Sequence, residues 1–253
     1  LCRRAHKTET PRAAAGKTLS TMRALFFGTP DIAVPSLVAL HEIAEVVGVV
    51  SQPDRPKGRG LHEEPTPVKA MALSLGLEVH QPTKVKTPEF AEWVASKNAD
   101  VALVIAYGRI LPEAVLRLPK RGFLNLHASL LPKYRGAAPI TWALANGEAE
   151  TGVCLMQMDA GMDTGPVFSA HRMPIGPSMT AGSLSEALGR LAADVTRQDL
   201  RKVMSGELSS VPQDPSRATH ARMLTKDDGL IPFQKTAIEV HDHIRAMSPW
   251  PSA

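Results

Sequence analysis

The sequence predicts an α/β fold in which an open, mainly parallel sheet is covered by helices on both faces. Three observations indicate this fold. Short apolar runs recur along the chain, and segments of helix length separate them. The third observation is size, because 253 residues with 43% hydrophobic composition are enough for one sizeable domain and part of a second. Apolar strands that alternate with helices are typical of parallel sheets buried on both faces.

The expected elements begin at Met22. Residues 22–30 form a short apolar strand that ends at a Gly-Thr-Pro turn, and residues 31–40 follow it as a helix. Three further buried strands are expected at residues 44–50, 99–108 and 122–128. Helices are expected between these strands at residues 65–76 and 87–98.

The second half of the chain adds two strands and a long helix. Residues 151–158 and 165–175 are read as neighbouring strands that extend the sheet in antiparallel fashion. Residues 181–204 are expected to form a long helix with an apolar face. Its apolar positions are Leu184, Leu188, Leu191 and Val195. Residues 207–225 are rich in polar and turn-forming residues, which predicts a linker.

The excess positive charge lies at the start of the chain. The formal net charge is +4, and residues 1–20 carry all of it, so the remainder is neutral. The pI of 9.2 is therefore no evidence for a basic nucleic-acid-binding face on the body. Residues 1–21 lack the apolar core of a secretory signal and are expected to be a disordered extension. The alternative is an organellar presequence.

Sequence motifs of common cofactors are absent. The turn after the first strand has a single glycine, unlike the G-x-G-x-x-G of a dinucleotide site, and no G-x-x-x-x-G-K-[ST] phosphate loop occurs. Paired-cysteine and H-E-x-x-H spacings are also missing, so we expect no metal. Cys2 and Cys154 lie far apart and give no disulfide framework, which fits a reducing compartment. No apolar run of the roughly 18 residues that span a membrane occurs.

Two polar side chains interrupt the strand expected at residues 122–128. Asn125 and His127 alternate with Leu124 and Leu126, so they lie on one face, ~7 Å apart along the strand. A buried Asn or His left without a hydrogen-bond partner costs about 1–3 kcal/mol. Either both are satisfied locally and support a loop, or they point into a pocket at the end of the strand. The pair alone favours the first interpretation.

The surrounding loops support the second interpretation, in which the two side chains point into a pocket. Ligands of open α/β sheets bind beyond the carboxyl ends of strands, where polar loops follow the third and fourth expected strands. A further glycine-rich loop, residues 158–166, carries Asp163 and also Asp159, which we interpret as a loop-capping acid. A His beside a carboxylate can move protons near neutral pH, and an Asn amide can donate to a developing oxyanion. Since no Ser or Cys is clearly placed as a nucleophile, the set suits an attacking group supplied by a substrate. Structural polar loops are the competing explanation.

Long, ordered motifs of this chain resemble those of the folate-dependent formyltransferases. The resemblance is carried by NLHASLLPKYRGAAPI at residues 125–140 and MDAGMDTGP at residues 158–166. Further segments that look like this family are FGTPDIAVPSL, SQPDRPKGRG, PTPVKAMA, VALVIAYGRILPEAVL and SPWP. The resemblance runs from Met22 almost to the end. It implies the Rossmann-like formyltransferase fold, with residues 22–206 as the catalytic domain.

The resemblance also implies an activity and its partners. The formyl donor would be 10-formyltetrahydrofolate, a co-substrate used without a metal, and the acceptor would be the α-amine of methionine esterified to initiator tRNA. Asn125, His127 and Asp163 fall on the catalytic positions of the family. The folate-binding positions fall on Arg109, Ile110, Leu111, Ser129, Leu130, Leu131 and Pro132. The insertion that grips tRNA falls on residues 54–67 and carries Arg55, Lys57 and Arg59.

Some features depart from the family pattern or leave a role open. Glu63 and Glu64 follow the basic part of the insertion, and acids there weaken the attraction to phosphate. The family continues with a β-barrel domain that supports tRNA, of which residues 226–253 are expected to be only the start. Lys133 and Arg135 could contact folate glutamate or tRNA phosphate, but solvated loop charges are at least as good an interpretation. We expect a monomer in the bacterial cytoplasm, or in an organelle if the N-terminal extension is a presequence.

Two alternative functions stay open. The first keeps the class of enzyme and changes the acceptor to glycinamide ribonucleotide or an amino-sugar nucleotide, although the QPDRPKGRG and SPWP segments favour tRNA. The second is a folate-binding protein that no longer catalyses transfer. The intact Asn-His-Asp set argues against it.

Overall fold

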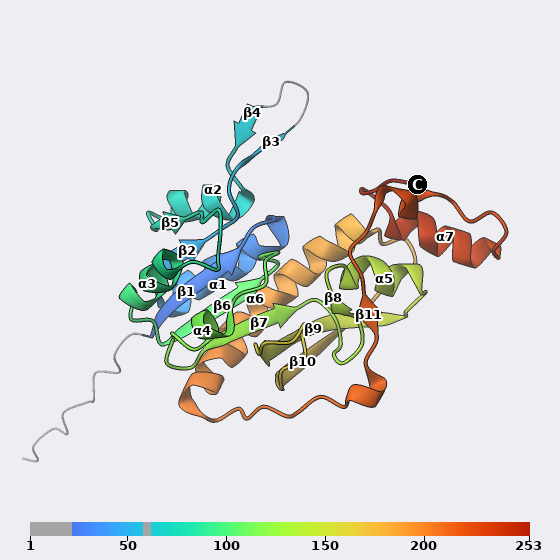
Figure 1. Ribbon diagram of the computed structural model, residues 1–253. Helices are drawn as coiled ribbons and strands as arrows, with labels where there is room; N and C mark the ends of the chain where they lie inside the picture. The colour runs from blue at the N-terminus through green and yellow to red at the C-terminus, as the bar shows by residue number, and fades with distance from the viewer. Residues whose placement is uncertain (1–21, 58–61) are drawn as a thin grey trace, which may run out of the picture.

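One seven-stranded sheet organises the chain in the computed structural model, which describes residues 22–57 and 62–253. The strand order is β10-β9-β7-β6-β1-β2-β5 (Figure 1). The strands are β1 (Arg23–Gly28), β2 (Glu45–Val50), β5 (Val79–His80), β6 (Val101–Ile105), β7 (Phe123–His127), β9 (Glu150–Gln157) and β10 (Val167–Pro174). The neighbouring strands β5, β2, β1, β6 and β7 pair in parallel. Strand β9 pairs in antiparallel fashion with β7 on one side and with β10 on the other. The predicted mainly parallel sheet with an antiparallel addition is confirmed.

Side chains of β1 alternate between two cores, one on each face of the sheet. Ala24 and Phe26 belong to the core formed with α1 (Val34–Ile43), α2 (Pro67–Ser74) and α6 (Ala181–Ser205). Leu25 and Phe27 belong to the core formed with α3 (Pro88–Ser96) and α4 (Glu113–Leu116). Because both faces of the sheet are buried, its central strands are continuous apolar runs rather than alternating ones.

The helix expected over residues 181–204 is α6, and its ends follow from local chemistry. Thr180 begins it with a capping box, in which the Thr180 hydroxyl accepts from the Ser183 amide at 3.3 Å. Gly206 ends it in the left-handed conformation with φ +81°. Leu184, Leu188 and Val195, three of the predicted apolar positions, are fully buried.

Several short elements are not evident in the sequence patterns. β3 (Arg55–Lys57) and β4 (His62–Glu64) form an antiparallel hairpin that extends away from the large sheet (Figure 1). β8 (Arg135–Gly136) pairs with β11 (His220–Ala221) across a long stretch of sequence. The remaining short elements are η1 (Asp31–Ala33), α5 (Pro139–Ala145), η2 (Pro215–Arg217) and η3 (Lys226–Gly229). Strands of two or three residues carry no readable period, because their partners determine them.

The end of the chain is helical where the structure describes it. Residues 226–253, expected to begin a β-barrel domain, contain η3 and α7 (Ala237–Ala246), and α7 packs against α5. The expected extension at residues 1–21 and the expected tRNA contact Arg59 lie outside the described residues. No helix in the described part of the chain has the length and apolar character needed to cross a membrane.

Candidate active site

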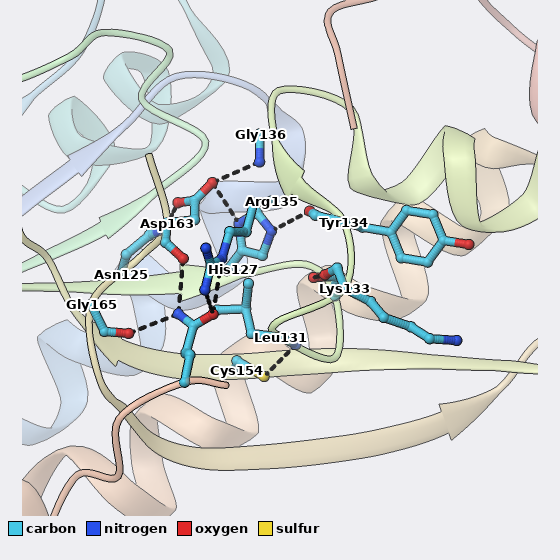
Figure 2. Close-up of polar contacts among 12 residues, drawn as sticks. Asn125, His127, Leu131, Lys133, Tyr134, Arg135, Gly136, Cys154, Asp163 and Gly165 are labelled. Atoms are coloured by element: carbon cyan, nitrogen blue, oxygen red, sulfur yellow. Dashed lines mark hydrogen bonds and ion pairs between the residues drawn. The ribbon is translucent and has the colours of Figure 1, made fainter. Parts of the chain in front are cut away.

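Strand β7 carries two polar side chains to one face of the sheet. Leu124 and Leu126 point into the core that contains α6, so Asn125 and His127 point to the opposite face. His127 is 5% exposed, and Asn125 is half-buried. Tyr134, Gly136 and Asp163 lie beside these two side chains (Figure 2). The predicted placement of this pair on one face is therefore confirmed.

Both ring nitrogens of His127 face oxygen atoms. Nε2 lies 2.8 Å from the carbonyl oxygen of Tyr134, which can only accept, so Nε2 carries a proton. Nδ1 lies 3.6 Å from Oδ2 of Asp163 (Figure 2). Oxygen atoms that can accept a hydrogen bond therefore face both ring nitrogens.

Asp163 joins the loop of residues 158–166 to β7. Its Oδ1 accepts from Nδ2 of Asn125 at 3.4 Å, and its Oδ2 accepts from the Gly136 amide at 2.9 Å. Its backbone is left-handed with φ +53°, a conformation that Asp tolerates better than most residues. Asp159 caps the same loop, because its carboxylate accepts from the Gly161 amide at 3.0 Å and from the Thr164 hydroxyl. The interpretation of Asp159 as a capping acid is confirmed.

The site contains three residues that the sequence analysis did not identify. Tyr134 contributes its backbone carbonyl to His127, and Gly136 contributes its backbone amide to Asp163. Gly136 has φ +118°, and a Cβ at this position would lie 2.6 Å from the Ala221 carbonyl oxygen, so glycine is required. The sequence signal for this close approach of two backbone segments is the glycine itself, at the end of the KYRG motif. Gln213, 50 residues from Asp163, donates to the Asp163 carbonyl at 2.8 Å, and no sequence signal points to it.

The protein's own hydroxyl and thiol groups near this site are already engaged. The Ser129 hydroxyl is fully buried and donates to the Lys133 carbonyl at 2.7 Å. The Cys154 thiol is buried, and burial raises its pKa to about 11, so it stays neutral. Its sulfur accepts from the Leu131 amide at 3.4 Å. The arrangement therefore suits proton transfer and oxyanion stabilisation with a nucleophile brought by the substrate.

The positions expected to bind folate lie on two loops at the carboxyl edge of the sheet. Arg109, Ile110 and Leu111 follow β6; the Arg109 guanidinium donates to the Thr83 carbonyl at 2.6 Å, and the Ile110 side chain is 68% exposed. Ser129, Leu130, Leu131 and Pro132 follow β7. The Ser129 hydroxyl acts within its own loop. All seven residues stay predictions as folate contacts.

The expected tRNA positions belong to the β3–β4 hairpin, whose base is fixed by Asp54. Arg55 and Lys57 lie on β3. The Asp54 carboxylate accepts from the Gln81 side chain at 2.7 Å and from the Thr66 amide at 3.3 Å, and it pairs with Lys69. Burial alone would raise the pKa of Asp54, but hydrogen bonds from Lys69, Gln81 and Thr66 outweigh it and lower the pKa below its usual 3.8.

Asp54→Asn is expected to reduce the free energy of unfolding by about 1–2 kcal/mol at neutral pH, because it removes the charge that pairs with Lys69. A carboxyl with a lowered pKa stabilises the fold above its ordinary pKa, and this contribution is lost as the pH falls through and below 3.8. Urea unfolding of parent and variant at neutral pH and below 3.8 should therefore give a difference that shrinks in acid. Glu92→Gln, at an exposed position on α3, is the control. An equal difference at both pH values would contradict the role of the Asp54 charge.

Metal-ligating side chains do not gather in the part of the chain that the structure describes. Over residues 22–57 and 62–253, no group of three or more His, Cys, Asp or Glu side chains is arranged to hold a metal ion. Asn125, His127 and Asp163 contribute one histidine and one carboxylate, and both ring nitrogens of His127 face oxygen atoms.

Sequence comparisons place the chain in a family. The formyl transferase family matches residues 22–198, and the formyl transferase C-terminal domain matches residues 223–253. The chain therefore belongs to the formyl transferase family. Among its relatives are methionyl-tRNA formyltransferases: the enzyme from Sorangium cellulosum is 65% identical over 232 residues, which are 92% of this chain and 75% of the relative. The enzyme from Myxococcus xanthus is 50% identical over 235 residues, 93% of this chain and 75% of the relative.

Solved structures share the fold at low sequence identity. An N-formyltransferase from Helicobacter canadensis, in complex with folinic acid and dTDP-3-aminofucose, matches with a TM-score of 0.68 at 21% identity, over 89% of this chain and 80% of that chain. HypX from Aquifex aeolicus, in complex with tetrahydrofolic acid, matches with a TM-score of 0.64 at 17% identity, over 92% of this chain and 35% of that chain. The predicted α/β formyltransferase fold is thereby confirmed.

Proposed function

We propose that this chain transfers the formyl group of 10-formyltetrahydrofolate to the α-amine of methionyl-initiator tRNA. The observation that carries the proposal is the contact of His127 with Asp163 beside Asn125, in a chain 65% identical to a methionyl-tRNA formyltransferase. An Asn amide, a histidine with acceptors at both nitrogens and a carboxylate supply what acyl transfer to an amine requires.

In this mechanism the uncharged amine attacks the formyl carbon, and a new C–N bond forms as the carbonyl opens to an oxyanion. The second N–H of the Asn125 amide and the imidazolium of His127 stabilise that oxyanion. The bond from the formyl carbon to the folate nitrogen then breaks. The imidazolium of His127 gives its Nδ1 proton to the folate nitrogen, and the proton lost by the amine returns to Nδ1 through a water held by Asp163. No covalent enzyme intermediate is needed, in keeping with the engaged Ser129 hydroxyl and the neutral Cys154 thiol.

The two substrates would approach from loops at the carboxyl edge of the sheet. The loop of Arg109, Ile110 and Leu111 follows β6, next to β7 in the sheet, which supports its assignment to the folate donor. The loop after β7 supplies the other folate positions, Ser129, Leu130, Leu131 and Pro132. Arg55 and Lys57 on the β3–β4 hairpin are assigned to the acceptor end of tRNA, and Asp54 holds the base of that hairpin.

A competition assay tests the proposal directly. With 10-formyltetrahydrofolate as donor, kcat/KM for methionyl-initiator tRNA is expected to exceed that for glycinamide ribonucleotide or an amino-sugar nucleotide by roughly 10²-fold or more. Transfer of labelled formyl groups measures this ratio. N-acetylmethionyl-tRNA, whose amine is blocked, is the control and should give no product. A preference for either small acceptor would show that this acceptor, and not tRNA, is the substrate. The absence of transfer to any acceptor would support the folate-binding alternative.

The same assay tests the expected independence from metal. The rate of formyl transfer should be equal with and without a strong chelator, because the proposed residues supply the proton transfers and the oxyanion donors themselves. A large loss of rate that added divalent metal restores would contradict this mechanism.

A further inference from the structure

One segment near the end of the chain crosses both loops that form the candidate active site. We call it the strap, residues 211–221. At its start, Val211 and Val167 exchange backbone hydrogen bonds of 2.8 and 2.9 Å, which ties the strap to the end of the loop that carries Asp163. At its end, β11 pairs with β8, next to the Tyr134 carbonyl that contacts His127. The strap thus joins the loop of Asp163 to the loop that orients His127.

Gln213 lies within the strap and uses both ends of its side-chain amide. Its Nε2 donates to the Asp163 carbonyl at 2.8 Å and to the Gly165 carbonyl at 2.7 Å. Its Oε1 accepts from Nε of Arg135 at 3.0 Å and from Nη2 at 2.8 Å. Asp163, Gly165 and Arg135 lie together in Figure 2. A single side chain therefore connects the two loops directly.

Arg135 lies between the two backbone groups that contact the side chains of His127 and Asp163. The carbonyl of Tyr134, the preceding residue, accepts from His127, and the amide of Gly136, the following residue, donates to Asp163. The Arg135 side chain is buried, with 7% exposure, so it is not the solvated loop charge that its sequence context allowed. Gln213 holds its guanidinium, and the two peptide groups that contact His127 and Asp163 flank the same residue. Gln213 thus acts on Asp163 from two directions, through the Asp163 carbonyl and through the Arg135 loop.

We infer that Gln213 is a positioning residue for formyl transfer, which holds Asp163 at its distance from His127 without touching the substrates. The predicted loss of rate rests on the proposed function, whereas the positioning of Asp163 does not. Misplacement of a catalytic group by about 1 Å can cost up to 10²-fold in rate. The hydrogen bonds that the structure describes for Gln213 go to Arg135, Asp163 and Gly165 and not to the donor loop after β6, so donor binding should be preserved.

Kinetics of three single variants test the inference. Gln213→Ala should lower kcat by roughly 10- to 100-fold with little change in KM for the folate donor. Gln213→Glu restores an acceptor for Arg135 but turns a carboxylate toward the Asp163 and Gly165 carbonyls, so it should lose a similar factor. Gln198→Ala, which truncates an exposed glutamine on α6, is the matched control and should keep parental kinetics. Parental kcat in both Gln213 variants would overturn the inference.

Combination with an Asp163 variant separates positioning from general stabilisation. In an Asp163→Asn background the carboxylate to be positioned is absent, so Gln213→Ala should cost little more. Independent losses that multiply would indicate that Gln213 acts elsewhere.

Hydrogen exchange tests the same geometry without turnover. The Gly136 amide donates to Asp163 Oδ2 and should exchange about tenfold faster in Gln213→Ala, whereas the Leu126 amide in β7 should exchange at its parental rate. Equal acceleration at both amides would show loss of global stability and would overturn local positioning. Because this measurement needs no substrate, it remains decisive even if the chain transfers no formyl group.

Discussion

His127→Ala is expected to lower kcat for formyl transfer by about 10²–10⁴-fold while leaving the fold and the binding of the folate donor largely intact. An imidazole side chain can both donate to an oxyanion and move a proton near neutral pH. Its ring is held between the Tyr134 carbonyl at 2.8 Å and Asp163 at 3.6 Å, so a replacement side chain without nitrogen atoms restores neither contact. Single-turnover rates at saturating donor measure the loss without interference from product release.

The control for His127→Ala is a second histidine that also contacts an aspartate. His171 on β10 pairs with the buried Asp199 at 2.7 Å, on an element that carries none of the proposed catalytic residues. His171→Ala should lower stability to a similar degree but keep kcat within a few-fold of the parent. If His127→Ala retains near-parental turnover at saturating donor, the mechanism is wrong.

Asp163→Asn is expected to reduce kcat by about 10²-fold or more, with the side-chain volume preserved. The amide removes the negative charge that faces Nδ1 of His127. It also introduces a donor where Asn125 and the Gly136 amide both require an acceptor. The loss should therefore appear in kcat, since the change affects the imidazolium and its water rather than the donor loop.

Asp159→Asn on the same loop provides the comparison for Asp163→Asn. Asp159 accepts from the Gly161 amide and the Thr164 hydroxyl, and an Asn oxygen can still accept from the amide. We expect less than a tenfold loss of kcat for this variant. Equal losses in the two variants would mean that loop conformation, and not the Asp163 charge, limits the reaction.

The placement of Asn125 and His127 could be predicted from the sequence because it depends on strand periodicity alone. Leu124 and Leu126 define the buried face of β7, so the intervening side chains must take the other face. The approach of Asp163 to this pair was also expected, but the path of the loop that brings it there was not. β9 is antiparallel to β7 and ends with Gln157 opposite Leu124, so the following loop returns along the face of the sheet to bring Asp163 to His127.

The supporting contacts of the site could not be predicted in the same way. The Tyr134 contribution is a backbone carbonyl, which every residue type possesses, so its side chain gives no indication of the role. Gln213 belongs to a polar stretch that resembles a linker, and its contacts depend on the pairing of β11 with β8. Such pairing is decided by tertiary structure, whereas sequence patterns report local periods.

The strap also has a consequence for the order in which the site assembles. His127 and Tyr134 are seven residues apart in sequence, so their contact closes a short loop. Gln213 and Asp163 are 50 residues apart, and the whole of α6 lies between them. Closing the longer loop costs more chain entropy, and contacts of long sequence separation form more slowly. During synthesis, the chain therefore exposes Asn125, His127 and Asp163 well before residue 213 emerges to fix their geometry.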